Sequence, residues 1–291
     1  MKFGQVTDPG KVDFTLPTDH PDNKRVLKNG PKVKPTFHVG CAKWNKTDLK
    51  NFYPKGVKDE LEYYAGHFNC IELNAIFYRL FPVDQFLKWR DKTPAGFKFF
   101  PKITQDISHL KRLNGVENIV DTYVHHVSHL GDKLGTVFLQ LREDFSPKDF
   151  NRIVQFVEYW PREMQLAVEV RHPGWFDNAA VSNELFHLLE SNGVTNVLVD
   201  TAGRRDMLHM RHTNRSTFIP YVGANHPSDY QRLDEWVARI SDWVKQGINE
   251  INFFVHQNIE LESPLLSAYL IEQLNKKLTL ELKVPQTQKK K

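Results

Sequence analysis

The sequence is short of the residues that would build a disulfide-held, zinc-held or membrane-inserted protein. It contains only 2 cysteines in 291 residues, Cys41 and Cys70, too few for a disulfide scaffold or a zinc finger. No apolar run reaches the roughly 18 residues that cross a bilayer, and the first residues lack an apolar signal core. We therefore expect a protein of a reducing, cytoplasmic compartment without a membrane partner.

Several motifs of cofactor and hydrolase chemistry are also missing. No Gly-x-Gly-x-x-Gly or Gly-x-x-x-x-Gly-Lys follows a predicted strand, which argues against a bound nucleotide. There is no His-x-His, no His-Glu-x-x-His and no Gly-x-Ser-x-Gly. No organic cofactor is indicated, and a divalent metal is an alternative that the sequence does not favour.

What is present is ordinary globular composition, with 40% hydrophobic and 25% charged residues. The formal net charge of +4 favours anionic ligands only weakly. Residues 1–35 are rich in proline, lysine and aspartate and predict an extended N-terminal arm. Residues 36–280 read as a single domain, and residues 281–291 as a basic C-terminal tail.

Hydrophobic periodicity predicts strands and helices in alternation. The expected strands are 37–42, 70–74, 97–102, 136–141, 166–172, 196–200, 218–222 and 251–256. Helices are expected at 58–67, 83–92, 116–130, from Ser146-Pro147 onward, at 179–191, 230–244 and 264–278, with a loop at 201–216 in place of one helix. Eight parallel strands in this order predict an α/β fold of the (β/α)₈ TIM-barrel type. An open, doubly wound sheet is the alternative.

Alternation along each strand then assigns side chains to the barrel interior. The inward ionisable residues are Glu72, Lys98, Lys102, Glu169, Arg171, Asp200 and His256, and Asn74, Gln140 and Asn258 share their faces. Most come late in their strands, where barrel enzymes place their active sites. Charges removed from water must pair with one another or with a ligand. A structural ion-pair network is the alternative to a ligand site.

The residue types suggest separate roles. Candidate catalytic residues are Glu169, Glu72, Lys102, His172 and Asp200, because carboxylates, imidazole and a perturbed amine can move protons. Two lysines on one face, Lys98 and Lys102, lower the pKa of one of them, which suits anion binding or a reactive amine. Arg171 offers a planar fork for a carboxylate or phosphate. Further substrate contacts are expected from Asn74, Tyr78, His109, Gln140, Trp175, Trp44, His256 and Asn258, with packing as the alternative for the aromatic residues.

Several segments together resemble a known family. They are Val39-Gly40-Cys41-Ala42-Lys43-Trp44, Phe52-Tyr53-Pro54, Ile71-Glu72-Leu73-Asn74 with Phe77-Tyr78, Phe97-Lys98-Phe99 with Lys102 and Ser108-His109, Leu139-Gln140-Leu141, and Val168-Glu169-Val170-Arg171-His172-Pro173-Gly174-Trp175. Over about residues 37–278 the chain resembles the YecE-like proteins, the domain of unknown function 72 family. The resemblance implies a TIM-type barrel and assigns no activity.

The family pattern is not fully kept. Ala42-Lys43-Trp44 stands where the family usually has Ser-Gly-Trp, and Pro220 stands before Tyr221 where the family usually has an arginine. If that arginine holds an anion, this protein is expected either to bind the anion less well or to use Arg211 or Arg215 instead.

Three functions remain open on this basis. The first is an enzyme of hydrolase or lyase type that acts on a small phosphate- or carboxylate-bearing molecule, with Arg171 and Lys102 holding the anion. The second is a nucleic-acid binding or processing protein, suggested by the basic 201–216 loop, the lysine-rich arm and tail, and an analogy to barrel endonucleases. The third is a non-catalytic ligand-binding protein. In all three cases a bound divalent metal is not favoured, because the three cations Lys98, Lys102 and Arg171 beside the carboxylates would repel it.

Overall fold

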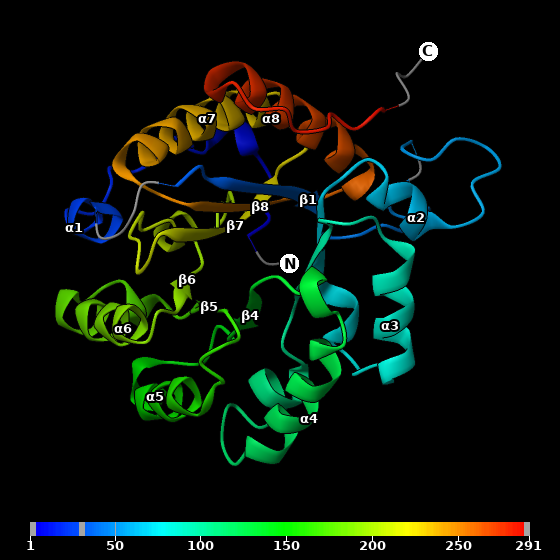
Figure 1. Cartoon of the computed structure of the whole chain (residues 1–291). Helices are drawn as coiled ribbons and strands as arrows, with labels where there is room; N and C mark the ends of the chain where they lie inside the picture. The colour runs from blue at the N-terminus through cyan, green and yellow to red at the C-terminus, as the bar shows by residue number, and fades with distance from the viewer. Residues whose placement is uncertain (1–3, 29–32, 50, 288–291) are drawn as a thin grey trace.

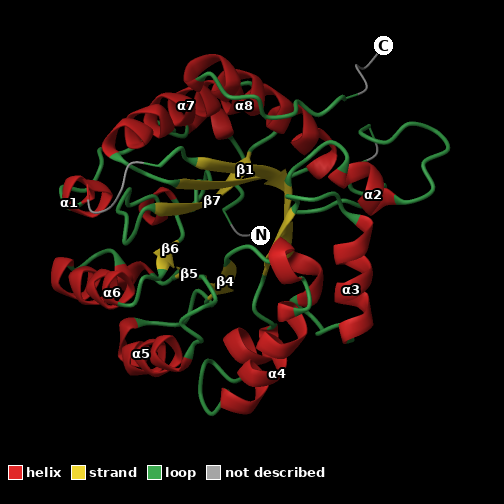
Figure 2. Cartoon of the chain, viewed as in Figure 1, coloured by secondary structure: helices red, strands yellow, loops and turns green. Residues whose placement is uncertain are grey.

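Short strands alternate with helices throughout the computed structural model, which describes residues 4–28, 33–49 and 51–287. The helices lie outside and the strands inside (Figures 1 and 2). The strands are β1 (Thr36–Cys41), β2 (Cys70–Leu73), β3 (Lys98–Pro101), β4 (Val137–Gln140), β5 (Leu166–Glu169), β6 (Thr195–Asn196), β7 (Ser216–Gly223) and β8 (Glu250–Gln257). Parts of the expected arm and tail, residues 1–3, 29–32 and 288–291, lie outside the described residues.

The helices begin and end at recognisable sequence signals. They are α1 (Asn23–Lys28), α2 (Glu60–Ala65), α3 (Val83–Lys92), α4 (Glu117–Ser128), α5 (Phe150–Tyr159), α6 (Ala179–Ser191), α7 (Ser228–Gln246) and α8 (Ser263–Leu278). Asp59 and Asn178 cap α2 and α6 by accepting hydrogen bonds from first-turn N–H groups. Helix α7 ends at Gly247, whose φ of 116° is open to glycine. Between β6 and β7 lies only the short 3₁₀ turn Arg205–Met207, as the predicted loop requires.

All strand pairs in the described chain are parallel, which confirms the α/β class. Continuous pairing forms three groups, β1–β8–β7, β2–β3 and β4–β5–β6. Single parallel bridges connect β3 to β4 at Lys102–Phe138, and β6 to β7 at Val197–Phe218. The closed eight-stranded barrel stays a prediction, which these bridges favour.

Pro220 explains the interrupted ladder between β6 and β7. Leu198 and Asp200 donate their N–H groups to the carbonyls of Phe218 and Pro220, and Val222 donates to Asp200. The next donor on this side of β7 would be the N–H of residue 220, which proline lacks. One rung is therefore missing, as expected for a proline inside a strand.

Side chains join β1 to β2, and we call their contacts the β1–β2 seam. The Tyr64 hydroxyl accepts a hydrogen bond from the Cys41 N–H at 2.7 Å and donates to the Cys70 carbonyl at 3.0 Å. Asn69 bridges the same strands through both ends of its side-chain amide. A Cβ at Gly40 would lie 2.3 Å from the Cys70 carbonyl oxygen, so this close approach requires glycine.

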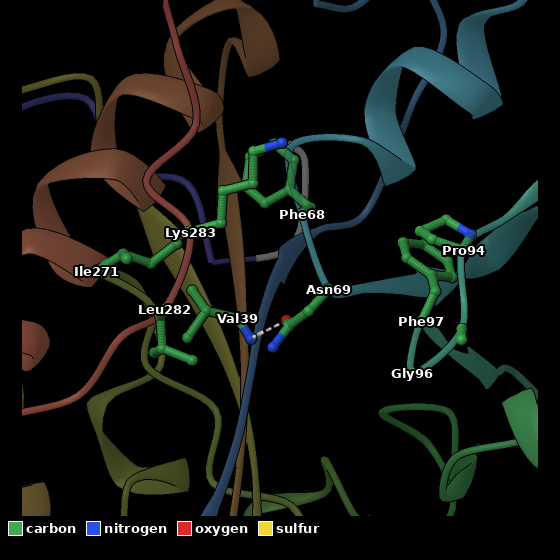
Figure 3. A pocket seen from close by; sticks show the side chains of 10 residues that line it. Val39, Phe68, Asn69, Pro94, Gly96, Phe97, Ile271, Leu282 and Lys283 are labelled. Carbon is green, nitrogen blue, oxygen red and sulfur yellow. Dashed lines mark hydrogen bonds between the residues drawn. The ribbon is translucent and has the colours of Figure 1, made fainter.

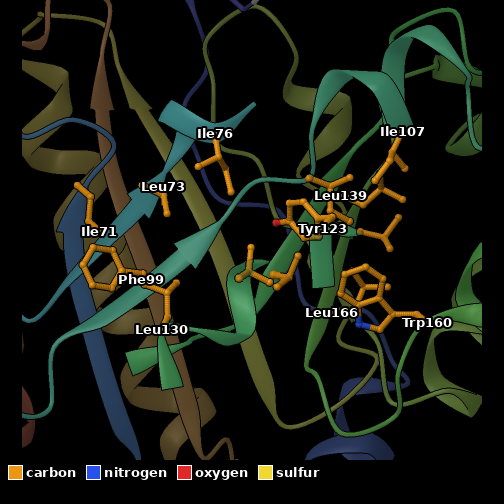
Figure 4. Close-up of a cluster of buried hydrophobic side chains, with 14 of the residues drawn as sticks. Ile71, Leu73, Ile76, Phe99, Ile107, Tyr123, Leu130, Leu139, Trp160 and Leu166 are labelled. Carbon is orange, nitrogen blue, oxygen red and sulfur yellow. The ribbon is translucent and has the colours of Figure 1, made fainter. Parts of the chain in front are cut away.

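Two apolar layers surround the strands. The outward faces pack on the helices, and Figure 4 shows part of this layer: Ile71, Leu73, Phe99, Leu139 and Leu166 with Tyr123 and Trp160. The inward faces contribute Phe100, Phe138, Phe218 and Phe254, whose neighbouring ring centroids lie 4.7–6.1 Å apart. We call these four residues the aromatic floor. They fill the space between the strands below the polar residues at the strand ends.

The predicted phase of β6 and the residues after it is wrong. Val197 and Val199 pack inward with the aromatic floor, whereas Leu198 packs outward in the same cluster as Trp236 of α7. Asp200, two positions after Leu198, therefore points outward as well. Every residue from Val197 to Val199 is apolar, so alternation alone cannot identify the inner face.

The described part of the N-terminal arm, residues 4–28, packs on the domain. Asp19 accepts a hydrogen bond from Arg239 of α7 at 2.7 Å, and Asp22 accepts one from Arg211 at 2.6 Å. Its buried apolar side chains are Phe14, Leu16, Val26 and Leu27. The arm thus contributes to the core, which its proline-rich sequence did not indicate.

Candidate functional site

The carboxyl ends of three consecutive strands bring polar side chains together. Gln140 ends β4 and Glu169 ends β5, and their parallel register sets the two residues side by side. Lys102 directly follows β3 and is bridged to Phe138 of β4. Because these side chains share the inward phase, they meet above the aromatic floor.

Lys102, Gln140, Glu169 and Arg171 form a connected group that we call the lysine–glutamate cluster. Lys102 Nζ donates to Gln140 Oε1 at 2.8 Å, and Gln140 Nε2 donates to the two Glu169 oxygens at 3.1 and 3.2 Å. Arg171 Nε donates to Glu169 Oε1. Glu169 is only 2% exposed, so Arg171 supplies the charge that a buried carboxylate requires.

A second pair, Glu72 and His256, adjoins this cluster. His256 Nε2 lies 2.8 Å from Glu72 Oε2, and Asn74 Nδ2 donates to Glu72 Oε1 at 2.8 Å. Burial alone would lower the pKa of His256, but Glu72 and then Glu260 raise it above its ordinary value. Burial would raise the pKa of Glu72, but His256, Asn74 and Lys102 lower it. The surroundings therefore favour an imidazolium–carboxylate pair.

Lys102 has the most unusual amine of the site. Burial lowers its pKa to about 8; Glu169 and Glu72 oppose this shift, and Arg171 adds to it. The Nζ atom also lies 4.4 Å from the centroid of the Phe77 ring. Such an amine is partly neutral near neutral pH, so it can act as a base or as a nucleophile.

The site opens to solvent on one side. The side chains of Arg171 and His256 are 17% and 20% exposed. A cavity of about 360 Å³ is lined by Ala42, Lys43, Trp44, Asn45, Asp48, Asn74, Ala75 and Tyr78. Asn74, which also holds Glu72, joins this cavity to the charged groups. The predicted contacts Trp44, Asn74 and Tyr78 thus line one cavity beside the charged groups.

His109 and Asn258 lie in loops that follow β3 and β8. His109 belongs to the π-helical turn Asp106–Leu110, and its Nδ1 lies 2.8 Å from Ser108 Oγ. Burial lowers the pKa of His109 to about 4, with Lys102 the next cause. His109 is therefore neutral at ordinary pH and can exchange hydrogen bonds but not supply a positive charge. Asn258 donates its backbone N–H to the Gly223 carbonyl at 3.1 Å, next to the end of β7.

Two residues predicted for the site after β5 have structural roles. Trp175 is 0% exposed, and its indole N–H donates to the Phe145 carbonyl at 2.8 Å, which favours packing, the alternative expected for the aromatic residues. His172 Nδ1 accepts from the Gly174 N–H at 3.0 Å and caps the 3₁₀ turn Pro173–Trp175. Its ring thus shapes the turn that follows Arg171.

Asp200 does not join the lysine–glutamate cluster, and its predicted place in the barrel interior is wrong. Its carboxylate is 0% exposed and accepts hydrogen bonds from Arg232 at 2.8 Å and from the Trp236 indole at 2.7 Å, both on α7. Arg205 also pairs with it. This ion-pair network holds α7 against the residues that follow β6.

Lys98 shares the phase of Lys102 but lies at the opposite end of β3, where its Nζ donates to the Asp132 carbonyl. A cavity of about 220 Å³ lies at this amino-terminal side. Figure 3 shows side chains that line it, Asn69 and Phe97 among them. Its lining is mainly apolar and contains none of the predicted site residues: Val39, Phe68, Asn69, Pro94, Ala95, Gly96, Phe97, Ile271, Leu282 and Lys283. This cavity is separate from the charged site.

The arginines of the 201–216 loop are engaged within the molecule. Arg205 donates to Asp200 and to carbonyl groups of the arm, and Arg211 pairs with Asp22 of the arm. The loop therefore does not present these cations as a free surface for nucleic acid.

Neither proposed substitute for the family's strand-seven arginine reaches the site. Arg211 bonds Asp22 and Asn183, away from the lysine–glutamate cluster. Arg215 precedes β7, and its Nε donates to the Gly247 carbonyl at 2.7 Å, at the amino-terminal end of the strand. The expectation that one of them replaces the missing arginine is wrong.

Three further residues of the site were not predicted from the sequence. Phe77 supplies the ring next to Lys102 Nζ, and its place in the Glu-x-Asn-x-x-Phe-Tyr segment was the available signal. Glu260 lies 3.9 Å from His256 Nδ1, and its spacing of four residues was the available signal. Arg204 donates to the Arg171 carbonyl at 2.6 Å, which fixes the backbone after β5.

The described residues contain neither a metal-binding cluster nor a membrane-spanning helix. In this part of the chain, no group of three or more His, Cys, Asp or Glu side chains lies close enough to hold a metal ion. No helix in residues 4–28, 33–49 and 51–287 combines the length and apolar character needed to cross a membrane.

Comparison with known proteins agrees with the resemblance seen in the motifs. The chain is similar to the UPF0759 protein YecE of Escherichia coli strain K12, with 28% identity over 264 residues, which cover 83% of this chain and 94% of YecE. It is 27% identical over 149 residues to the UPF0759 protein YunF of Bacillus subtilis strain 168, which covers 48% of this chain and 52% of YunF.

Solved structures share the fold at low sequence identity. A DUF72 family protein from Enterococcus faecalis V583 gives a TM-score of 0.67 at 15% identity and covers 85% of this chain and 99% of its own. One from Thermotoga maritima MSB8 gives 0.62 at 21% identity, with 84% and 99% covered. Residues 38–289 match the family model described as "Protein of unknown function DUF72", so the chain belongs to the DUF72 family.

Proposed function

We propose that this protein is an enzyme of hydrolase or lyase type that acts on a small phosphate- or carboxylate-bearing molecule. The proposal rests on one observation, the meeting of the lysine–glutamate cluster and the Glu72–His256 pair at the strand ends. We further propose that the eight strands close into a (β/α)₈ barrel, because isolated bridges and the β1–β2 seam link the three groups of paired strands. The carboxyl end of such a barrel is the usual place of its active site.

The charges suit an anionic substrate. Arg171 and Lys102 are both cationic and partly exposed, and they can take a carboxylate or phosphate from the side of the cavity. Glu169 and the Glu72–His256 pair can then accept and return a proton. A purely structural network is less favourable, because apolar side chains would fill the same volume without the cost of desolvating charges.

The nucleic-acid alternative loses part of its support. Arg205 and Arg211 of the basic 201–216 loop are already paired within the molecule. A non-catalytic ligand-binding role stays open, and turnover separates it from the enzyme.

Binding and turnover of a panel of small phosphates and carboxylates test the proposal. We expect at least one compound to bind the wild type in calorimetry, and Arg171→Met to weaken it by roughly tenfold or more, since a charged hydrogen bond contributes about 1.5–3 kcal/mol. Lys98→Met is the matched control, because Lys98 is also a cation of β3 but lies at the opposite end of that strand, away from the site. Glu169→Gln should keep binding and lose turnover, followed by NMR. Equal affinity in Arg171→Met and wild type would contradict the proposal.

A further inference from the structure

Lys102 differs from the other cations of the site in its partners. The two buried carboxylates already have cationic partners, Arg171 for Glu169 and His256 for Glu72. A lysine held only to neutralise one of them would form that ion pair itself. The position of Lys102 therefore needs another explanation.

The contacts of Lys102 leave its amine available. Its Nζ donates to the neutral amide oxygen of Gln140, and it lies over the Phe77 ring and 5.8 Å from the centroid of Phe138. An amide and two aromatic rings stabilise an ammonium group less than a carboxylate would. The residue is half-buried just past the end of β3, so a small molecule entering from the open side can reach it.

We propose that Lys102 forms an imine with a small aldehyde or ketone that also carries a carboxylate or phosphate. This inference rests on the proposed function and specifies its substrate class. Arg171, on the exposed side of Glu169, would bind the anionic group and orient the carbonyl toward Nζ. The lowered pKa of Lys102, to about 8, leaves enough neutral amine for the attack.

The step balances without an oxidant or a second substrate. The lone pair of neutral Nζ forms a C–N bond to the carbonyl carbon, the C=O π electrons pass to oxygen, and one proton moves from nitrogen to that oxygen to give the carbinolamine. The hydroxyl then takes up a second proton and leaves as water, and the nitrogen lone pair forms the C=N bond as the C–O bond breaks. Nitrogen finally loses its remaining N–H proton, which replaces the proton that the hydroxyl took up. One water is released for each imine, and the Glu72–His256 pair is placed to exchange the protons.

Reductive trapping tests this step. The full chain is incubated near pH 7 with pyruvate, glyoxylate or dihydroxyacetone phosphate and sodium cyanoborohydride, and adducts are located by peptide mass spectrometry. We expect Lys102 to be labelled roughly ten- to a hundredfold faster than Lys98, because burial lowers the pKa of Lys102 to about 8 and so leaves part of its amine neutral near pH 7. Lys98→Arg should retain the Lys102 adduct. Labelling that is uniform over the lysines would overturn the inference.

Two further arms separate this inference from the proposed function. Lys102→Arg and Lys102→Met, both checked for cooperative unfolding, should remove the fast adduct. Lactate, which matches pyruvate without the carbonyl, is titrated in parallel. If lactate and pyruvate bind equally and no adduct forms at Lys102, the imine is refuted while anion binding stands. If none of the anions binds and no adduct forms, both proposals fail.

Discussion

Two carboxylates of similar burial illustrate how context decides the role of a residue. Glu169 and Asp200 are 2% and 0% exposed, and each follows a run of apolar strand residues. Glu169 points inward and pairs with Arg171 at the open end of the strands, whereas Asp200 points outward and binds α7. The same residue type thus belongs to the candidate site after one strand and to helix packing after the next.

Replacing Asp200 should therefore affect stability rather than binding. Asp200→Asn removes one of the two carboxylates that pair with the buried Arg232, whose other partner is Asp229 at 3.1 Å, and breaking a buried ion pair costs about 3–5 kcal/mol. Chemical denaturation should show this decrease in the free energy of unfolding, while the affinity for a bound anion stays within error. A large loss of affinity in a variant that is still folded would return Asp200 to the site.

The Glu72–His256 pair should make stability depend on pH. The folded pKa of His256 is raised above 6.5, so its contribution is complete below that pH and is lost as pH rises through the folded value. The folded pKa of Glu72 is lowered below 4.5, so its contribution is complete above that pH and is lost as pH falls through the folded value. The pair should stabilise most between about pH 4.5 and 6.5. Unfolding of wild type and Glu72→Gln, measured from below pH 4.5 to above pH 6.5, tests this, because the difference in unfolding free energy should shrink on both sides of the window. Curves that stay parallel over the whole interval would refute it.

Among the elements, the β1–β2 seam depends on the Tyr64 hydroxyl together with the side-chain amide of Asn69. Tyr64→Phe would leave the Cys41 N–H and the Cys70 carbonyl buried without this partner, at a cost of about 1–3 kcal/mol. Tyr123→Phe is a matched control, because the described Tyr123 hydroxyl is buried without a hydrogen-bond partner. Chemical denaturation should show a lower free energy of unfolding for Tyr64→Phe and not for Tyr123→Phe. Hydrogen exchange of the Cys41 amide should become faster only in Tyr64→Phe. Equal effects in both variants would contradict this role for the seam.

Element type was predictable from the sequence where periodicity or caps were strong. The expected helices 83–92 and 179–191 coincide with α3 and α6, and the latter begins at an asparagine cap. The uniformly apolar run Val197–Val199 after β6 carried no information on its inner face, and Asp200 was therefore assigned to the wrong face. A side-chain bridge such as the one that Tyr64 makes between β1 and β2 has no sequence signature, because it depends on the distance between the two strands in the folded protein.

For the molecule as a whole, the arm should behave as part of the core. Leu27 is 1% exposed and packs in the cluster that contains Trp243, so Leu27→Ala should cost about 2–5 kcal/mol in chemical denaturation. Val33, at 51% exposure, provides the control, and Val33→Ala should stay within about 0.5 kcal/mol of wild type. A negligible effect of Leu27→Ala would mean that the arm is not docked in solution.

The candidate site was predictable in outline because parallel strands end at one edge. The alternation of side chains along the strands was enough to predict that five of its residues lie together: Glu72, Lys102, Gln140, Glu169 and Arg171. Alternation could not show that Trp175 is buried beside Phe145 or that Asp22 of the arm pairs with Arg211. Both contacts join segments that are far apart in the chain. The family match begins at residue 38, so the resemblance also carried no information on the arm.

The docking of the arm has a consequence for the order in which the chain folds during synthesis. Asp19 is synthesised 220 residues before its partner Arg239, and Asp22 is synthesised 189 residues before its partner Arg211. At roughly 5–20 residues per second, translation of that interval takes about 10–40 s. Until then Leu27 has no Trp243 to pack against, so the first segment to emerge is among the last to reach its native place.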